Sequence, residues 1–126
     1  MIVVRDTFSL VWGELPHTKF LSIDAGHTPE NVINDLSQAQ RVLRPGGIIA
    51  LDDYLNPYWE GVTDGFYRFM AHHNRRLRPF MFFRNKLFLT TISEHRDHVR
   101  RFAERMADYC DMRSVAGWDC VVERPH

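Results

Sequence analysis

The sequence has few features that would tie it to the cell exterior, a membrane or nucleic acid. It contains only two cysteines, too few for a disulfide framework, and begins without the basic segment and apolar core of a secretory signal. No apolar run approaches the roughly 20 residues that span a bilayer. The formal net charge is zero, so nothing favours non-specific attraction to nucleic acid or anionic membranes. We therefore expect a cytoplasmic protein without a nucleic-acid or membrane partner.

The composition is that of one folded domain. Apolar residues make up 44% of the sequence and aromatic residues 13%, which argues for a globular chain. A domain of 126 residues buries roughly two thirds of the surface that its unfolded chain exposes, enough for a core. Because no repeat, low-complexity tract or linker interrupts the sequence, we expect residues 1–126 to form a single domain.

Residues 20–54 follow the pattern of a strand, a helix and a second strand. The apolar runs 20–23 and 48–51 are short and end in polar turns, which is typical of strands covered on both faces. Between them, Thr28 can cap a helix that has Pro29 at its first position. Apolar residues recur along one face of this helix, at Val32, Leu36, Ala39 and Leu43.

The spacing within this unit predicts where its aspartates lie. Asp52 follows Asp24 by 28 residues, close to the roughly 30 residues of a right-handed parallel crossover. In such a crossover both strands point the same way, so Asp24, Asp52 and the adjacent Asp53 lie at one edge of the sheet. Neighbouring strands are separated by roughly 4.8 Å, close enough for carboxylates at their ends to share a ligand.

The remainder of the chain predicts further helices and strands. We expect a helix over residues 60–73, a break at Arg78-Pro79, and two strands over 80–83 and 86–90 in a hairpin. A second helix is expected over 94–109, with apolar residues facing inward at Val99, Phe102, Met106 and Tyr109. A closing strand is expected to contain Val115, Trp118, Cys120 and Val122. Residues 1–19 carry no pattern long enough to assign.

The clustered aspartates suggest chemistry. Three ionised carboxylates at one edge repel one another, so the cluster either raises a pKa or holds a cation. Oxygen ligands favour Mg²⁺, Ca²⁺ or Mn²⁺. Alternatively, Asp52 or Asp53 caps the following turn and Asp24 ends its strand in water. His27 is either a surface residue or, beside a metal-bound hydroxyl, a proton acceptor near pH 7.

Other polar and aromatic residues have simpler interpretations. The basic run 72–78 could meet a phosphate or an acidic partner, but a solvated helix end accounts for it more simply. His95 and His98 are read as part of a polar helix face rather than as metal ligands. Tyr54 either lines a substrate pocket or packs in the core. Core or pocket-wall positions are expected for the tryptophans, which are Trp12, Trp59 and Trp118.

The stretch FLSIDAGHTPENVINDLSQAQRVLRPGGIIALDDY resembles the second half of class I S-adenosylmethionine-dependent methyltransferases. It is most similar to small-molecule and sugar O-methyltransferases with an Asp-x-x-His turn, an Asp-Leu pair (Asp35-Leu36), a Leu-Arg-Pro-Gly-Gly turn and a terminal Asp-Asp. The similarity extends from Phe20 to Thr91. It implies a partial Rossmann-like α/β sheet, mostly parallel, with an antiparallel carboxyl-terminal hairpin.

The resemblance also implies the roles of individual residues. It implies that Asp24, Asp52 and Asp53 bind Mg²⁺ or a similar divalent cation and that His27 is the catalytic base. The substrate would be a hydroxylated small molecule, and S-adenosylmethionine would donate the methyl group. The metal would grip the substrate hydroxyls and align one with the donor.

The sequence departs from this family in its amino-terminal part. The family binds the donor through a glycine-rich turn many tens of residues before the first aspartate, whereas only 23 residues precede Asp24 and no G-x-G pair occurs. We therefore expect a truncated methyltransferase-like domain that lacks the donor-binding half. Such a domain exposes the apolar edge of strand 20–23 unless residues 1–15 or another chain cover it, which predicts self-association or a partner chain.

Two functions follow from these observations. The first is the carboxyl-terminal portion of a metal-dependent O-methyltransferase, which need not be active alone. The second is a non-catalytic, methyltransferase-derived domain that pairs with another chain.

Overall fold

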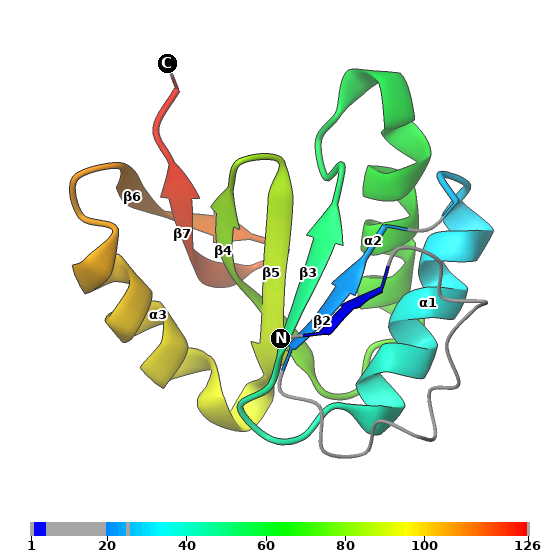
Figure 1. Ribbon diagram of the computed structural model, residues 1–126, viewed down its shortest axis with the longest axis horizontal. Coiled ribbons are helices and arrows are strands. Elements are labelled where there is room, and N and C mark those ends of the chain that lie inside the picture. The colour runs from blue at the N-terminus through cyan, green and yellow to red at the C-terminus, as the bar shows by residue number, and fades with distance from the viewer. Residues whose placement is uncertain (1, 5–19, 25, 126) are drawn as a thin grey trace.

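The computed structural model describes residues 2–4, 20–24 and 26–125 and shows a mixed α/β fold (Figure 1). Its seven-stranded sheet has the order β1-β2-β3-β5-β4-β7-β6. The strands are β1 (Ile2–Val4), β2 (Phe20–Ile23), β3 (Ile48–Asp52), β4 (Leu77–Phe83), β5 (Lys86–Thr91), β6 (Cys110–Val115) and β7 (Trp118–Glu123). The helices are α1 (Pro29–Val42), α2 (Glu60–His72) and α3 (His95–Arg105), with short 3₁₀ turns η3 (Pro57–Trp59) and η4 (Ile92–Glu94).

The predicted strand, helix and strand over residues 20–54 are confirmed. Thr28 caps α1 through its side-chain oxygen, which accepts a hydrogen bond from the Asn31 amide at 3.2 Å, and Pro29 begins the helix. Strands β2 and β3 are parallel neighbours, with Leu21 opposite Ile49. The crossover therefore brings the ends of both strands to one edge of the sheet, as the spacing predicts.

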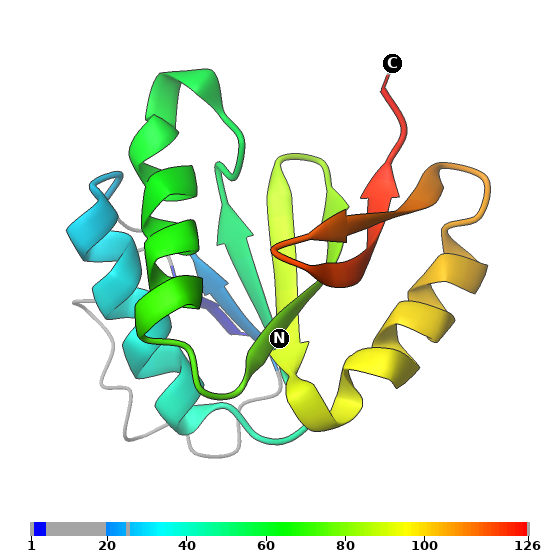
Figure 2. The ribbon, with the colours of Figure 1, turned by 180° about the vertical axis from the view of Figure 1, so that it is seen from behind.

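Helices cover both faces of the sheet (Figures 1 and 2). Helices α1 and α2 pack on the face that carries Leu21, Ile49 and Leu89, all of which are fully buried. Helix α3 packs through Val99 on the opposite face, against Phe80 and Val121 of β4 and β7. Successive strand residues alternate between faces, so strands β3, β4, β5 and β7 contribute to two apolar layers.

The sheet is mixed rather than mostly parallel, which corrects the expectation for the fold. β3 with β5, β4 with β5, and β6 with β7 are antiparallel pairs, whereas β1 with β2, β2 with β3, and β4 with β7 are parallel. The reason is that the hairpin β4–β5 inserts beside β3, and the hairpin β6–β7 continues the sheet beyond β4. The expected hairpin over residues 80–90 is confirmed.

Three expectations for the carboxyl-terminal half are wrong. The chain does not break at Pro79, which lies inside β4, where a register shift between Pro79 and Met81 accommodates a residue without an amide hydrogen. The helix expected over residues 94–109 is α3, which ends at Arg105. Tyr109 lies beyond it and is 61% exposed rather than facing inward. In place of the single closing strand that was expected, the structure has a hairpin of two strands, β6 and β7.

The two histidines of α3 do not belong to a polar helix face. His95 and His98 are both buried, and each ring points to backbone carbonyls of neighbouring strands or turns. Trp59 and Trp118 are 44% and 37% exposed, so they are wall rather than core residues. The expectation for Trp12 lies outside the described residues.

Strand β1 lies beside β2 in parallel register, with Val3 opposite Ser22. The backbone edge of β2 is thus paired within the chain, by part of the segment 1–15. None of the described helices combines the length and apolar character that crossing a bilayer requires.

Candidate functional site

Three of the four predicted site residues come together at the carboxyl ends of β2 and β3. One potential ligand atom from each of Asp24, His27 and Asp53 lies within 4.8 Å of the others. We call this group the acidic edge. Asp24 follows β2 directly, His27 lies in the turn before α1, and Asp53 follows β3. The parallel crossover therefore assembles the cluster from two segments that are far apart in sequence.

Asp53 is held in place by several hydrogen bonds. Its backbone has φ of 64°, a left-handed conformation that aspartate and asparagine adopt more readily than most residues. The Asp53 amide donates to the Asn85 carbonyl at 3.0 Å, and its carboxylate accepts from the side chains of Asn85 at 2.9 Å and Asn56 at 3.2 Å. These bonds orient the carboxylate before any ligand arrives.

Asp52 faces a different partner. Its carboxylate lies 3.1 Å from the Lys86 ammonium, which is directly opposite it on the antiparallel strand β5. Asp52 still belongs to β3, whereas Asp53 follows it, and the Asn85 amide nitrogen lies 3.4 Å from an Asp52 oxygen and 2.9 Å from an Asp53 oxygen. The structure therefore places Asp52 outside the group of three and gives it an ion pair instead.

His27 packs flat against Trp59. Their ring centroids are 4.0 Å apart with an interplanar angle of 16°, and His27 Nε2 lies 3.2 Å from a carboxylate oxygen of Asp53. An ionised carboxylate can only accept, so this nitrogen carries the hydrogen. Nδ1 is then the ring nitrogen able to accept a proton. The imidazole is oriented by both the stack and the carboxylate.

Gly61 of α2 allows the His27 turn to approach the helix. A Cβ atom placed at Gly61 would lie 2.1 Å from the backbone oxygen of His27, closer than side chains tolerate. Only glycine fits this approach, so α2 fixes the position of the turn that carries the histidine.

The cavity at the acidic edge is small. It has a volume of about 10 Å³ and is lined by residues that include Asp24, His27, Asp52 and Asp53. This is roughly the space of a single water molecule, so the cavity can hold one ion but cannot enclose a whole organic molecule. Two carboxylates and an imidazole can hold a divalent cation, but the nitrogen makes this set less selective for Mg²⁺ than three carboxylates.

Tyr54 has a packing role. It is 3% exposed, and its ring meets Phe66 and Phe82 edge-on. Burial, together with the hydrogen bond to the Tyr67 hydroxyl, raises the pKa of Tyr54 well above its usual range, so the phenol stays protonated. Of the two alternatives for this residue, the structure supports packing.

Sequence reasoning did not place Asn85 or Lys86 beside the site, and it expected Trp59 only as a core or pocket-wall residue. Arg84 and Asn85 both have positive φ and form the tight turn of the β4–β5 hairpin. The sequence predicts this turn, but only the antiparallel placement of β5 beside β3 brings it to Asp52 and Asp53.

Comparison with known families bears on the stretch that builds this edge. Residues 3–54 match a family model described as a methyltransferase domain. None of the curated proteins compared with the chain matches it. The matched stretch contains β2, α1 and β3 and all four predicted site residues, Asp24, His27, Asp52 and Asp53. It begins earlier than the resemblance seen in the sequence and ends at Tyr54, and it supports a methyltransferase domain over these residues.

Proposed function

We propose that the chain is the metal- and base-bearing portion of an S-adenosylmethionine-dependent O-methyltransferase that acts on a hydroxylated small molecule. The observation that carries this proposal is the convergence of Asp24, His27 and Asp53 within 4.8 Å, inside the stretch that matches a methyltransferase domain. Proton removal from a hydroxyl needs a base and a nearby positive charge, and this edge offers residues for both.

Each residue has a distinct task in this proposal. Asp24 and Asp53 hold a divalent cation, and the hydrogen bonds from Asn85 and Asn56 keep the Asp53 carboxylate oriented toward it. A bound divalent cation lowers the pKa of a hydroxyl that coordinates it. His27 takes the hydroxyl proton at Nδ1, because its Nε2 hydrogen is directed to Asp53.

The role of Asp52 in the proposal differs from the role implied by the family resemblance. Lys86 engages Oδ1 of Asp52, so a metal can use only Oδ2 unless the ion pair opens, and the nearby ammonium disfavours a cation there. In the arrangement proposed here, Asp52 contributes negative charge near the cation while remaining paired. Its loss therefore weakens metal binding less than the loss of Asp53.

The acidic edge leaves no room for the methyl donor. The cavity at the acidic edge is far too small for S-adenosylmethionine, and the sequence contains no G-x-G turn. In the proposal, donor-binding residues come from outside the part that the structure describes.

A second candidate is a non-catalytic domain that pairs with another chain. The absence of a glycine-rich turn favours it, as does the position of β1, which forms the outer strand of the described sheet. The outer strand of a sheet presents backbone groups to which a strand of a partner can add. In this case the acidic edge is a remnant of the matched family.

Calorimetry with S-adenosylmethionine, in the presence and absence of Mg²⁺ or Mn²⁺, separates the two candidates. Heat of donor binding supports the first, whereas the absence of both donor binding and metal binding under all conditions supports the second. The metal titration is repeated with His27→Gln. If His27 acts only as a base, the substitution leaves metal affinity within about threefold of the parent. If His27 is a metal ligand, the substitution lowers metal affinity at least about tenfold. If Asp24→Asn and Asp53→Asn both bind metal as the parent does, the metal assignment is wrong.

A further inference from the structure

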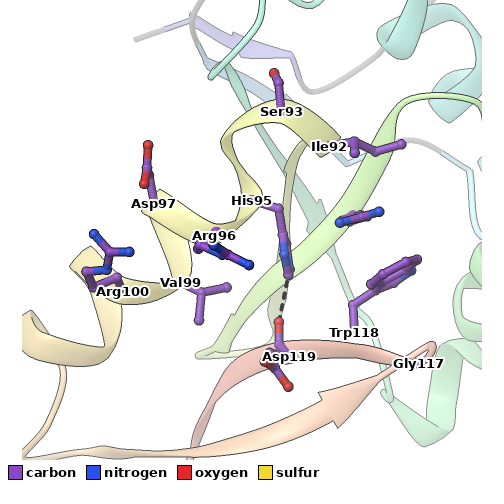
Figure 3. A pocket seen from close by; sticks show the side chains of 11 residues that line it. Ile92, Ser93, His95, Arg96, Asp97, Val99, Arg100, Gly117, Trp118 and Asp119 are labelled. Carbon is purple, nitrogen blue, oxygen red and sulfur yellow. Dashed lines mark hydrogen bonds between the residues drawn. The ribbon is translucent and has the colours of Figure 1, made fainter.

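A second polar site lies at the opposite edge of the sheet from the acidic edge. Strand β5 begins at Lys86 opposite Asp52 and runs away from it, ending at Thr91 beside η4. There, a cavity of about 680 Å³ opens between η4, the first turns of α3 and the start of β7 (Figure 3). We call it the arginine pocket, after Arg78, Arg96 and Arg100, which line it.

The three arginines carry charge that no carboxylate neutralises. Among the residues that the structure describes, none of the three forms an ion pair, although the lining also includes Asp97 and Asp119. In Figure 3 the Asp97 side chain extends away from Trp118, whereas Arg96 extends toward the side of the pocket where Trp118 lies. The lining therefore has a formal excess of one positive charge, and an anion entering it meets unpaired guanidinium groups.

Arg78 is placed to donate to such an anion. Its guanidinium carbon lies 3.6 Å from the centre of the Trp118 ring, so its flat face is covered by the indole. A guanidinium stacked in this way can use the N–H groups at its edge for a bidentate bond to an oxyanion. Its Nε atom is buried and has no hydrogen-bond acceptor among the described residues.

The floor of the pocket is rigid. His95 Nε2 lies 2.9 Å from the Pro79 carbonyl oxygen and 3.0 Å from the Asp119 carbonyl oxygen, the second contact being drawn in Figure 3. Both partners accept, so the nitrogen donates to them. This joins the start of α3 to β4 and β7. The positive end of the α3 dipole also faces the pocket, which adds a modest attraction for negative charge.

Another basic cavity, lined by Arg41, Arg75 and Arg76, is a weaker candidate for an anion. Its volume is about 790 Å³. Arg41 lies one residue before the end of α1, and His72, which also lines the cavity, lies at the carboxyl end of α2. The negative ends of two helix dipoles disfavour an anion there. Arg76 is moreover already bonded to the backbone oxygen of Gln40.

We propose that the arginine pocket binds a phosphorylated small molecule that carries an apolar or ring-shaped part. The phosphate lies among Arg78, Arg96 and Arg100, and the apolar part lies against Trp118 and Ile92, whose side chains are 37% and 43% exposed. A volume of about 680 Å³ exceeds what an inorganic phosphate fills and falls in the range of organic ligands. The three arginines take no part in the chemistry proposed for the acidic edge.

The test uses the whole chain and phenyl phosphate as the probe in calorimetry at low salt, with inorganic phosphate and benzoate alongside. Phenyl phosphate is expected to bind at least fivefold more tightly than either, because only it presents both a ring and two negative charges. Arg96→Gln and Arg78→Lys are each expected to weaken it about tenfold. Arg101→Gln is the matched control, an exposed arginine on the same helix that does not line the pocket.

Three results would overturn the proposal. One is the absence of phenyl phosphate binding at millimolar concentration. Another is an Arg101→Gln variant that loses as much affinity as Arg96→Gln, because the attraction would then be a general property of α3. The third is tight binding of a short RNA that phenyl phosphate does not displace. Circular dichroism of each variant checks that a loss of affinity does not come from a loss of folding.

Discussion

The acidic edge and the arginine pocket are built on opposite edges of one sheet, yet by different means. Asp24, His27 and Asp53 follow the ends of two parallel strands and are fixed by a crossover that the sequence predicts. The arginine pocket gathers residues from β4, η4, α3 and β7. The residues of the first site lie at the two strand ends of one strand–helix–strand unit, whereas the second site exists only after the sheet has been completed.

The two sites also differ in how tightly they are constrained. At the acidic edge, Asp53 is hydrogen-bonded to three side chains, and the His27 turn touches the backbone of α2 at Gly61. At the pocket, the three arginines make no ion pair among the described residues, and a Cβ atom added at Gly117 would meet no atom within 4 Å. A preorganised site loses function when any supporting atom moves, but an open site tolerates more change.

The largest expected effect tests this difference in constraint. Gly61→Ala places a methyl group against the His27 carbonyl oxygen and is expected to cost about 3 kcal/mol of unfolding free energy, because overpacking here involves backbone. Gly117→Ala, at the pocket, is the matched control. It meets no neighbour and is expected to cost only about 1 kcal/mol, from its φ of +86°. Urea unfolding monitored by circular dichroism measures both, and equal losses would contradict the comparison.

An intermediate effect is expected for Asp53→Asn. Asparagine fits the left-handed backbone and keeps the size of the side chain, but it removes one negative charge, so affinity for Mn²⁺ should fall by roughly 10–100-fold. Asp97→Asn, at the arginine pocket, should leave Mn²⁺ affinity unchanged. Calorimetric titration with Mn²⁺ gives both values. An equal fall in Mn²⁺ affinity for the two variants would mean that Mn²⁺ binding depends on the overall charge of the protein and not on the acidic edge.

The smallest effect is expected for Asn85→Gly. Glycine keeps the positive φ of the hairpin turn and the backbone bond to the Asp53 amide, but removes the side-chain bond that orients the carboxylate. Metal affinity should fall about tenfold, the lower end of what an outer-shell partner contributes. Phenyl phosphate binding at the arginine pocket should not change. Metal affinity equal to that of the parent would show that Asn85 serves the turn alone.

The sequence predicted the parts of the fold whose signals are local. Neighbouring residues alone predict the cap at Thr28, the apolar face of α1 and the end of α1 before Pro45. The structure shows all three features. Strand β6 was missed because its middle residues face solvent and give no alternating pattern. His95 and His98 were misplaced because their partners are backbone carbonyls from distant segments, which no spacing along α3 can indicate.

The candidate site was predicted in the same uneven way. Parallel crossover geometry is enough to bring Asp24 and Asp53 together, and this was expected from the spacing of strands. The separation of Asp52 from them depends on Lys86, which reaches the site only through the antiparallel pairing of β3 and β5. The metal and base roles of these residues remain predictions.

Strand β5 also links the formation of the two sites. A slip of one residue in its pairing with β3 would turn Leu87 and Leu89 out of the α1–α2 core. The same slip would separate Lys86 from Asp52 at one end and displace η4 at the other. Both sites therefore depend on one choice of register during folding, and a chain that makes the wrong choice loses them together.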